Sequence, residues 1–512
     1  MKVTFLGHAG LLIEAGGLRI ACDPWFSPEG AFLGAWHQFP PNAHVDQAAV
    51  RAADYLFLSH NHQDHFDERF LRSWSNPRTR VLIADYVSPH FLEMVEGLAI
   101  GEVVVARDWE PLELAPRVRA TVVRDPTLYK TDSALHLDAE GDTILNLNDC
   151  HLSGEPLCRL ASLGCHALFA QYSGASWYPE AYIYPEPRRL EITRRNREKN
   201  LDLFADKARV TSAPHVFPVA GPPCFIDPHQ FHLNFRETVF FDARDAVVEM
   251  ESRIGRPVNV LSPGDSFEMK GATLTWLERR SFDWTTRRAT LERLQEERLP
   301  RIESVLAAMP SPGGNLAERL KGALVARFNR NRRLAADVNG SVAFRVTGEL
   351  EATIVIRSDK TGVAGDVFAA PPPGVGYVFT MDARIANGLA EEYLEWEDVF
   401  LSMRFEARRE PDVYNWPMMA ILQFGRDTAL LRCVEQALYV GPGDRTVVSA
   451  EDRRSWTIQR YCPHAGQDLT GIAVDKRGCI TCPRHGWQFD LNDRGKCIEG
   501  GNIPLRIYEQ NI

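Results

Sequence analysis

The chain has 512 residues, 45% of them hydrophobic and 25% charged, a composition typical of folded domains that bury a core. At about 100 to 200 residues per domain, this length predicts three or four domains. The net charge of −10 argues against general binding to nucleic acid or anionic membranes, and no apolar run approaches the roughly 18 residues of a membrane-spanning helix.

Residues 1–270 alternate short apolar runs with turn signals, which predicts a layered α/β domain. The first apolar run is interrupted by His8 and lacks a small-residue cleavage site, so we interpret it as a strand rather than a signal peptide. Gly16-Gly17 lies between two apolar runs and predicts a hairpin. Later strand-like runs each end in Asp or His, as expected where strand ends carry a site; they are residues 55–60, 80–85, 118–125 and 143–149.

Residues 59–65 read SHNHQDH and follow one of these predicted strands. The stretch contains His60, His62, Asp64 and His65, a density of imidazole and carboxylate that is typical of a metal site. Both hydrolysis over zinc and oxygen chemistry over iron use such ligands. The stretch therefore predicts a metal centre but not, by itself, its reaction.

Residues 271–429 have a different character. Apolar residues recur at helical spacing over residues 285–309, where Pro300 is expected to kink or split the helix. SPGG at 311–314 then predicts a break before a second helix at about residues 315–335. Strand-like runs follow, so we expect an α+β domain with a structural or substrate-covering role; the runs are residues 341–348, 352–358 and 377–383.

Residues 430–512 combine short strand-like runs with a second group of potential ligands, Cys462, His464, Cys482 and His485. Zinc fingers place Cys with Cys and His with His along the chain, whereas each pair here offers one Cys and one His. A Rieske [2Fe–2S] cluster needs this mixture, because one iron takes both thiolates and the other both imidazoles. The flanking CPRHGW resembles the Rieske domains of ring-hydroxylating oxygenases, and a Cys2His2 zinc site is the alternative.

The cluster is expected at the low-potential end of its class. High-potential Rieske proteins resemble one another in a disulfide between the two loops and a hydroxyl aimed at a cluster sulfur. Here Gly466 and Gln467 bring no extra Cys, and Trp487 stands where a Ser would be expected. Fewer hydrogen bonds to the sulfurs give a potential around −150 mV. Cys479 and Cys497 are then expected to be buried thiols, and the scattered cysteines favour a cytoplasmic protein.

The N-terminal motif resembles H-x-H-x-D-H of the metallo-β-lactamase superfamily. The resemblance implies an αββα sandwich in which His60 and His62 bind one metal and Asp64 and His65 bind a second. It also aligns Asp149 with a bridging aspartate. One further histidine of that superfamily appears here as Asp125 or is missing, and the last appears as Ala220. His151 and His215 are therefore candidates to substitute, and His8 and Asp23 are candidates to support the ligands, with a plain structural role as the alternative for all four.

Other segments narrow the resemblance to the UlaG-like lactonases and the CMP-N-acetylneuraminate hydroxylases; they are GHAG (7–10), ACDPWF (21–26), LNLNDC (145–150), QYSGASWYP (171–179) and FPVAGPPC (217–224). The hydroxylases also contain a Rieske domain, although there it precedes the lactamase-like domain. The residues between the two domains here resemble a sterol-carrier unit. We therefore do not carry the sialic-acid substrate over to this chain.

Together these observations predict three domains: a metallo-β-lactamase-like α/β sandwich (1–270), a helical plus α+β domain (271–429) and an all-β Rieske domain (430–512). We expect a Rieske-dependent iron oxygenase that uses O2 on a small polar substrate, with electrons from an external ferredoxin, reductase or cytochrome. Its site would hold one or two iron ions, with Asp64 and Asp149 as the catalytic carboxylates and a ligand set of His60, His62, Asp64, His65, Asp149 and His151. The alternative is a zinc hydrolase with a redox-sensing or structural cluster. No nucleic-acid or membrane partner is expected, and a homo-oligomer is compatible with the sequence.

Overall fold

A computed structural model describes residues 1–440 and 443–511 and divides the chain into two compact units. Unit 1 comprises Met1–Pro126, Lys130–Ser176 and Leu190–Leu306. Unit 2 comprises Thr127–Tyr129, Trp177–Arg189 and Ala307–Ile512. Among the described residues, no helix combines the length and the apolar character needed to cross a bilayer.

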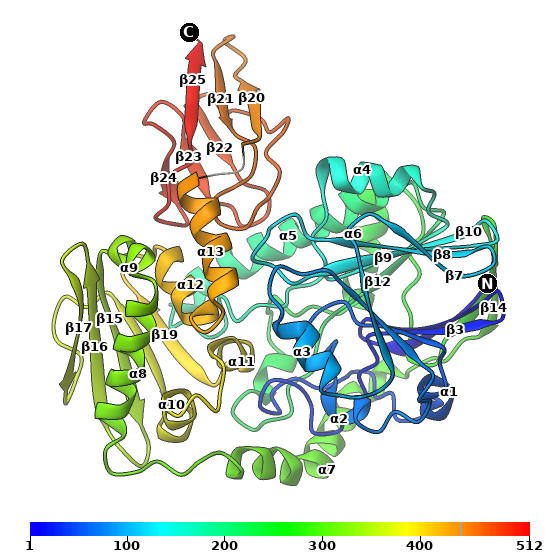
Figure 1. The fold of residues 1–512 in the computed structure, drawn as a ribbon, viewed down its shortest axis with the longest axis horizontal. Helices are drawn as coiled ribbons and strands as arrows, with labels where there is room; N and C mark the ends of the chain where they lie inside the picture. Colours follow the sequence, from blue (N-terminus) through cyan, green and yellow to red (C-terminus); the bar gives the residue numbers. More distant parts are fainter. Residues whose placement is uncertain (441–442, 512) are drawn as a thin grey trace. The chain divides into compact units, whose positions relative to one another are not determined.

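Two sheets form the centre of unit 1 (Figure 1). In spatial order, the first contains β14 (Thr273–Glu278), β13 (Ser266–Lys270), β1 (Lys2–Gly7), β2 (Gly10–Ala15), β3 (Leu18–Cys22), β4 (Tyr55–Phe57), β5 (Arg80–Ala84) and β6 (Glu102–Ala106). The second contains β12 (His215–Val219), β11 (Ala167–Gln171), β10 (Asp142–Asn148), β9 (Ser133–Ala139), β8 (Val118–Arg124) and β7 (Pro111–Ala115). The predicted hairpin is confirmed, because β2 and β3 pair across Gly16-Gly17.

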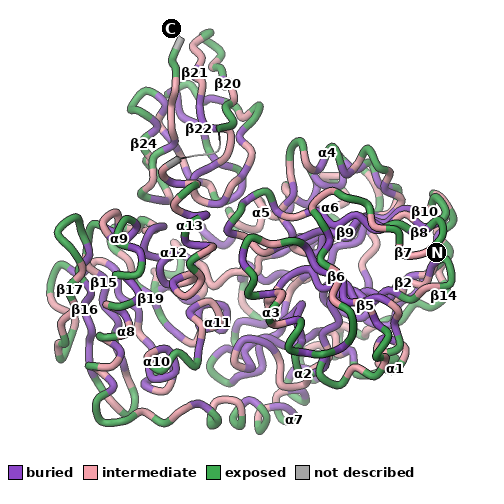
Figure 2. Tube along the Cα trace, viewed as in Figure 1, coloured by how far each residue is buried: buried purple, intermediate pink, exposed green. Residues whose placement is uncertain are grey.

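Alternation of side chains along the strands builds three apolar layers. In β2, Leu11 and Ile13 enter the core between the sheets, while Leu12 packs outward on the layer beneath the first helices. The two sheets are joined by a stack of Phe169, Phe217 and Phe267, with ring centroids 4.6 and 5.0 Å apart. Figure 2 shows the strands of this sandwich as mostly buried chain.

Helices cover both outer faces, which gives the expected αββα order. On the first sheet they are α1 (Gln47–Arg51), α2 (Glu68–Leu71) and α3 (His90–Glu96). On the second they are α4 (Gly154–Ser162), α5 (Glu186–Thr211) and α6 (Ala243–Ile254). The remaining helices of this region are η1 (Phe231–Asn234), η2 (Trp284–Thr286) and α7 (Arg287–Ala307).

Two features of unit 1 differ from the sequence-based expectation. The domain does not end at residue 270, because β14 pairs with β13 and α7 packs in the same unit. Pro300 does not split α7, which is one helix from Arg287 to Ala307. Leu294 before the proline and Ile302 after it enter the same apolar cluster, so packing holds the helix together on both sides of the missing N–H.

Unit 2 contains the predicted α+β part, a five-stranded sheet in the order β17 (Gly362–Phe368), β16 (Ala352–Asp359), β15 (Gly340–Thr347), β18 (Tyr377–Asp382) and β19 (Phe405–Arg409). Its helices are α8 (Leu316–Arg330), α9 (Arg332–Val338), α10 (Ala383–Ala390), α11 (Trp396–Ser402), α12 (Trp416–Phe424) and α13 (Thr428–Glu435). The helix expected at 315–335 is broken at Asn331, whose side chain accepts a hydrogen bond from Leu334 N at 3.0 Å and so starts α9.

The C-terminal part of unit 2 is all-β, as expected. After the π-helical turn η3 (Gln436–Val440), one small sheet contains β20 (Arg445–Ser449), β21 (Ser455–Gln459) and β25 (Ile507–Asn511). The other contains β22 (Cys479–Thr481), β23 (Gln488–Asp490) and β24 (Lys496–Glu499). Compact packing places this part in the same unit as the α+β sheet.

Candidate functional site

The candidate metal site lies where strands of the two sheets end. His8 follows β1, Asp23 follows β3, His60 lies beyond β4, and Asp149 follows β10. His8 and Asp23 adopt left-handed backbone conformations, with φ of 50° and 39°, which turn the chain sharply as it leaves each strand. This conformation costs conformational energy for residues other than glycine, and residues that adopt it are concentrated at functional sites.

Hydrogen bonds fix the backbone path of the loop that carries the histidine-rich motif, residues 59–65. Phe66 N donates to His62 O at 2.7 Å and closes a turn within the motif. The Asp67 carboxylate then accepts from Ser27 N at 2.7 Å and from Phe70 N at 3.1 Å, which caps α2 and ties the loop to the segment after β3.

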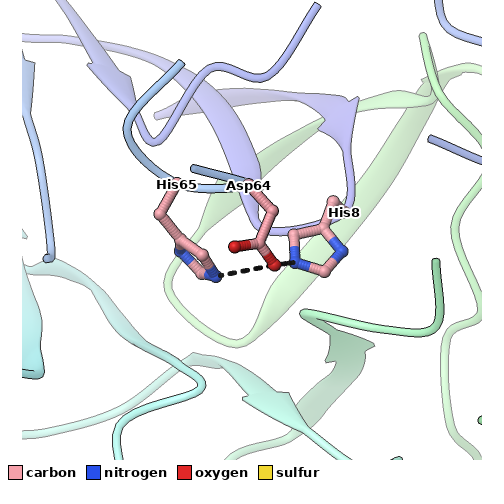
Figure 3. Close-up of side chains that lie close together, drawn as sticks. All are labelled: His8, Asp64 and His65. Atoms are coloured by element: carbon pink, nitrogen blue, oxygen red, sulfur yellow. Dashed lines mark ion pairs between the residues drawn. The ribbon is translucent and has the colours of Figure 1, made fainter. Parts of the chain in front are cut away.

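Two overlapping groups of potential ligands share His65. In the first, the Asp64 carboxylate lies between two imidazoles, 3.0 Å from His8 Nε2 and 3.9 Å from His65 Nε2 (Figure 3). In the second, Asp149 Oδ2 lies 3.7 Å from His60 Nε2 and 3.6 Å from His65 Nε2. In each group the ligand atoms lie within 4.8 Å of one another, a spacing that suits a metal ion. The shared histidine makes either one or two ions geometrically reasonable.

A buried hydrogen-bond network fixes which nitrogen each imidazole presents. Ser59 Oγ donates to Asp23 Oδ2 at 2.6 Å, so its lone pair is left to accept from His60 Nδ1 at 2.9 Å. His65 Nδ1 donates to the same Asp23 oxygen at 3.0 Å. Both rings therefore carry the Nδ1 proton and direct Nε2 toward Asp149. Such outer hydrogen bonds orient imidazole ligands and increase their basicity.

The electrostatics of the site favour a cation. Burial alone would lower the pKa of His65, but the carboxylates of Asp149, Asp64 and Asp23 outweigh it and raise that pKa to about 10. Burial, together with repulsion from His65 and His62, lowers the pKa of His60. In the metal-free site, the protonated ring of His65 thus provides a positive charge that is stabilised by the surrounding carboxylates.

The buried donor atoms fit a bound metal. Within residues 1–440 and 443–511, Asp64 Oδ1, Asp149 Oδ1 and His65 Nε2 are buried without a hydrogen-bond partner. Unsatisfied buried polar atoms are costly and need an explanation. Imidazole nitrogens with carboxylate oxygens form the donor set used by iron and zinc, so these residues fit either ion.

Not every residue that was predicted from the sequence as a metal ligand belongs to these two groups. His62 lies beside them, its Nδ1 3.0 Å from His60 Nε2, and His151 follows Asp149 but is in neither group. His215 lies at the opposite end of its strand and donates through Nε2 to Ala272 O at 2.9 Å. Ala220, where the superfamily pattern expects a histidine, is buried and bonds through its N–H to His8 O at 2.9 Å.

Asp132 is a site residue that sequence reasoning missed. It is buried at the start of β9, and its backbone oxygen accepts from Asp125 N at 2.9 Å, so the two aspartates close the base of the β8–β9 connection. Burial raises the pKa of Asp132, Lys130 opposes the shift, and Asp149 and Asp125 add to it. The sequence around Asp132 carries only a weak indication of a site residue, because a single Asp before a strand is common in turns.

The second site consists of two loops with the same backbone hydrogen bonds. In the first, Cys462 N donates to Gln467 O at 2.8 Å and Gly466 N to Cys462 O at 3.0 Å. In the second, Cys482 N donates to Trp487 O at 2.8 Å and Gly486 N to Cys482 O at 2.9 Å. Gly466 and Gly486 have φ of 65° and 72°, a conformation that glycine adopts without strain.

The two loops bring the four predicted cluster ligands together. The rings of His464 and His485 have centroids 4.5 Å apart, and Trp487 stacks on His464 at 4.3 Å with an interplanar angle of 1°. A hydrogen bond from the Cys462 thiol lowers the pKa of Cys482 to about 7, opposed by burial and assisted by the N–H groups of Arg484 and His485. Paired thiols and paired imidazoles are the donor set of a Rieske cluster.

The other cysteines agree in part with expectation. Among the described residues all ten are free thiols, so neither loop carries a disulfide. Cys479 is buried as predicted, whereas Cys497 is only half-buried.

Comparison with known proteins identifies both regions. Residues 2–135 match the β-lactamase superfamily domain, and residues 426–508 match the Rieske [2Fe-2S] domain. A Rieske 2Fe-2S iron-sulfur protein of Mycolicibacterium smegmatis is 29% identical over 99% of this chain and 100% of its own length. The cytidine monophosphate-N-acetylneuraminic acid hydroxylase of Mus musculus is 24% identical over 46% of this chain and 41% of the hydroxylase. The predicted resemblance is thereby confirmed.

Among solved structures, CmlA, a diiron β-hydroxylase from Streptomyces venezuelae, covers 54% of this chain and 54% of its own, with 16% identity and a TM-score of 0.35. Igni18, a metallo hydrolase from Ignicoccus hospitalis, covers 52% of this chain and 99% of its own, with 16% identity and a TM-score of 0.36.

Proposed function

We propose that this chain, which joins a β-lactamase superfamily domain to a Rieske [2Fe-2S] domain, is an oxygenase that hydroxylates or otherwise oxidises a small polar substrate. The supporting observation is that two sites of complementary chemistry occur on one polypeptide. Hydrolysis transfers no electrons and has no use for a Rieske cluster, which holds one electron, whereas oxygen chemistry at iron consumes electrons.

At the N-terminal site, His60, His65 and Asp149 would hold one metal ion, and His8, Asp64 and His65 offer a second, overlapping set. Iron bound by two imidazoles and a carboxylate keeps coordination positions open for O2 and substrate. Asp23 accepts a hydrogen bond from His65 Nδ1, and Ser59 accepts one from His60 Nδ1. Both rings therefore direct Nε2 toward the metal site.

Asp64 and Asp149 are the carboxylates that we assign to proton handling as well as metal binding. The Asp64 carboxylate is paired with His8, whose Nε2 lies 3.0 Å away, so a proton can be exchanged within that buried pair. Asp132 adds a further carboxyl that acts electrostatically on Asp149; burial raises its pKa, Lys130 opposes that shift, and Asp149 and Asp125 add to it.

At the C-terminal site, Cys462 and Cys482 would hold one iron of the cluster, and His464 and His485 the other. The thiol pair is buried, which keeps water from the sulfurs, while His485 is exposed and His464 is half-buried. We therefore assign the His485 edge to electron entry from an external donor such as a ferredoxin, a reductase or a cytochrome.

The hydroxylase of Mus musculus supports the reaction class by the activity its name states and by its similarity to 46% of this chain. The substrate of that enzyme is not transferred, because the similarity covers less than half of each of the two chains. A small polar substrate is what the charged, partly buried metal site would accommodate.

Two measurements test this proposal. Metal analysis of the protein purified without oxygen is expected to give about three or four iron atoms per chain and negligible zinc. Reduced protein supplied with candidate substrates should then consume O2 and place 18O from 18O2 in the product. About two zinc and two iron atoms, with no O2 consumption, would instead favour a zinc hydrolase with a structural or redox-sensing cluster.

A further inference from the structure

One short segment of the lactamase-like sequence packs against the first cluster loop. Between β8 and β9 the chain leaves unit 1 after Pro126, contributes Thr127–Tyr129 to unit 2, and rejoins unit 1 at Lys130. Tyr129 Oη donates to His464 O at 2.6 Å, and Thr127 Oγ1 donates to Ala465 O at 3.3 Å. The loop peptide that follows a cluster ligand is therefore held by two side chains distant in sequence.

A third donor reaches the same peptide from the second cluster loop. Arg484, which lies between the ligands Cys482 and His485, donates through Nη1 to Ala465 O at 2.7 Å. Its side chain is buried, so this charge-assisted hydrogen bond joins the two cluster loops.

The contacts made by Thr127 and Tyr129 are buried and closely packed. Tyr129 is 4% exposed, and its ring lies 5.5 Å from Trp416, which itself meets His464 edge-on at 5.5 Å. Thr127 approaches so closely that a Cβ added at Gly466 would lie 1.9 Å from its Oγ1. Buried hydrogen bonds of this kind are costly to lose, because the carbonyl left behind has no water to replace the donor.

We propose that Thr127 and Tyr129 are positioning residues for the cluster ligand His464, because their hydroxyl groups hold the backbone of the first cluster loop. The inference rests on the proposed function only in that the C-terminal loops hold a Rieske cluster. Its tests need no turnover, so they remain informative even if the oxygenase assignment fails.

The first test is Tyr129→Phe in the full-length protein with its cluster bound. Losing the hydroxyl should accelerate bleaching of the cluster by a chelator about tenfold, the effect of roughly 1.4 kcal/mol, and should broaden the EPR signal of the reduced cluster. Tyr55→Phe is the matched control, because Tyr55 also donates to a backbone oxygen, Leu114 O at 3.2 Å, but does so within unit 1. Wild-type bleaching and EPR in Tyr129→Phe would overturn the positioning role.

The second test applies the same measurements to Thr127→Val, which removes the hydroxyl that donates to Ala465 O at 3.3 Å. Bleaching of the cluster by the chelator should again be faster than in the wild type and in Tyr55→Phe. If Tyr129→Phe folds poorly, Thr127→Val keeps the test decisive, and wild-type bleaching and EPR in Thr127→Val would overturn the positioning role of Thr127.

Discussion

His65 Nδ1 lies 3.0 Å from Asp23 Oδ2, and both side chains are fully buried. Asp23 is not a ligand in either candidate group, but it fixes the ring that both groups share. We expect Asp23→Asn to weaken iron binding about 10- to 100-fold, the usual cost of losing such an outer partner. Titration of the metal-free protein with Fe2+ under anaerobic conditions measures this change.

The control for Asp23→Asn is Asp138→Asn, which removes a carboxylate that pairs at 2.8 Å with the exposed Arg119. That variant should bind iron as the wild type does. Equal affinity in the Asp23 and Asp138 variants would mean that the ring of His65 keeps its orientation without the buried carboxylate, and the proposed support of the metal site would be wrong.

Metal binding at the N-terminal site should depend on pH through His65. Although burial opposes it, the carboxylates of Asp149, Asp64 and Asp23 raise the pKa of His65 to about 10, so below that pH the metal-free ring carries a proton on the ligand nitrogen. A metal must displace this proton, and affinity should therefore rise about tenfold per pH unit between neutral pH and pH 10, then level off.

Calorimetry in two buffers of different ionisation enthalpy checks this dependence, because the binding heat then reports about one proton released per metal at pH about 8. His136→Gln is a suitable control, since burial lowers the pKa of His136 and that ring is neutral under these conditions. Affinity that does not change with pH over this range would show that His65 is already unprotonated in the metal-free site.

The short ligand motifs point to the two candidate sites more directly than the apolar patterns point to the helices and strands that lie between them in the sequence. Cys462, His464, Cys482 and His485 were predicted from their spacing and from the flanking CPRHGW, because a Rieske cluster takes one thiolate and one imidazole from each of two short loops. The apolar runs that end in Asp or His predicted a layered α/β domain, and the resemblance to the metallo-β-lactamase superfamily implied its αββα order. Local sequence suffices where ligands lie close together along the chain.

Contacts between distant segments were not readable. Asp132 joins the metal site only because β9 pairs beside β10, and Pro300 remains inside α7 because apolar contacts hold both halves of that helix. Thr127 and Tyr129 carry no motif at all, and their role depends on packing against residues more than 300 positions away. Single-sequence patterns do not encode such pairings.

Two arginines of α5 should differ sharply in their contribution to stability. Arg189 pairs with Glu180 at 3.2 Å, and their side chains are 5% and 0% exposed, whereas Arg194 pairs with Glu237 at 2.8 Å in an exposed position. Arg189→Met leaves a buried carboxylate without its cation and should cost about 3–5 kcal/mol. Arg194→Met should cost at most about 1 kcal/mol. Thermal unfolding of the two variants distinguishes them, and equal midpoints would contradict the assignment.

The reduction potential of the cluster should lie near −150 mV, at the low end for such centres. No disulfide joins the loops among the described residues, and Trp487 stacks on His464 where a hydroxyl donor would stabilise the reduced cluster. A redox titration followed by EPR measures this value in the full-length protein. A potential well above zero would show that donors other than a disulfide and a serine hydroxyl reach the sulfurs.

The twin cluster loops allow a comparison of steric effects at equal backbone strain. Gly466 and Gly486 have φ of 65° and 72°, but a Cβ at Gly466 would meet Thr127 Oγ1 at 1.9 Å, whereas a Cβ at Gly486 would meet no atom within 4 Å. Gly486→Ala should therefore cost only the backbone strain of about 1 kcal/mol and keep its cluster. Gly466→Ala should lose most of the cluster.

The cause of that loss can be isolated by a second substitution. Thr127→Gly removes the atoms that the new methyl group would meet, so Gly466→Ala/Thr127→Gly should regain cluster relative to Gly466→Ala alone, measured by iron content and visible absorption. Strain in the loop itself would be unaffected by Thr127, since that strain resides in φ of residue 466. If the double variant held no more cluster than the single one, close packing of Thr127 against the His464 loop would not be the reason that glycine is needed there.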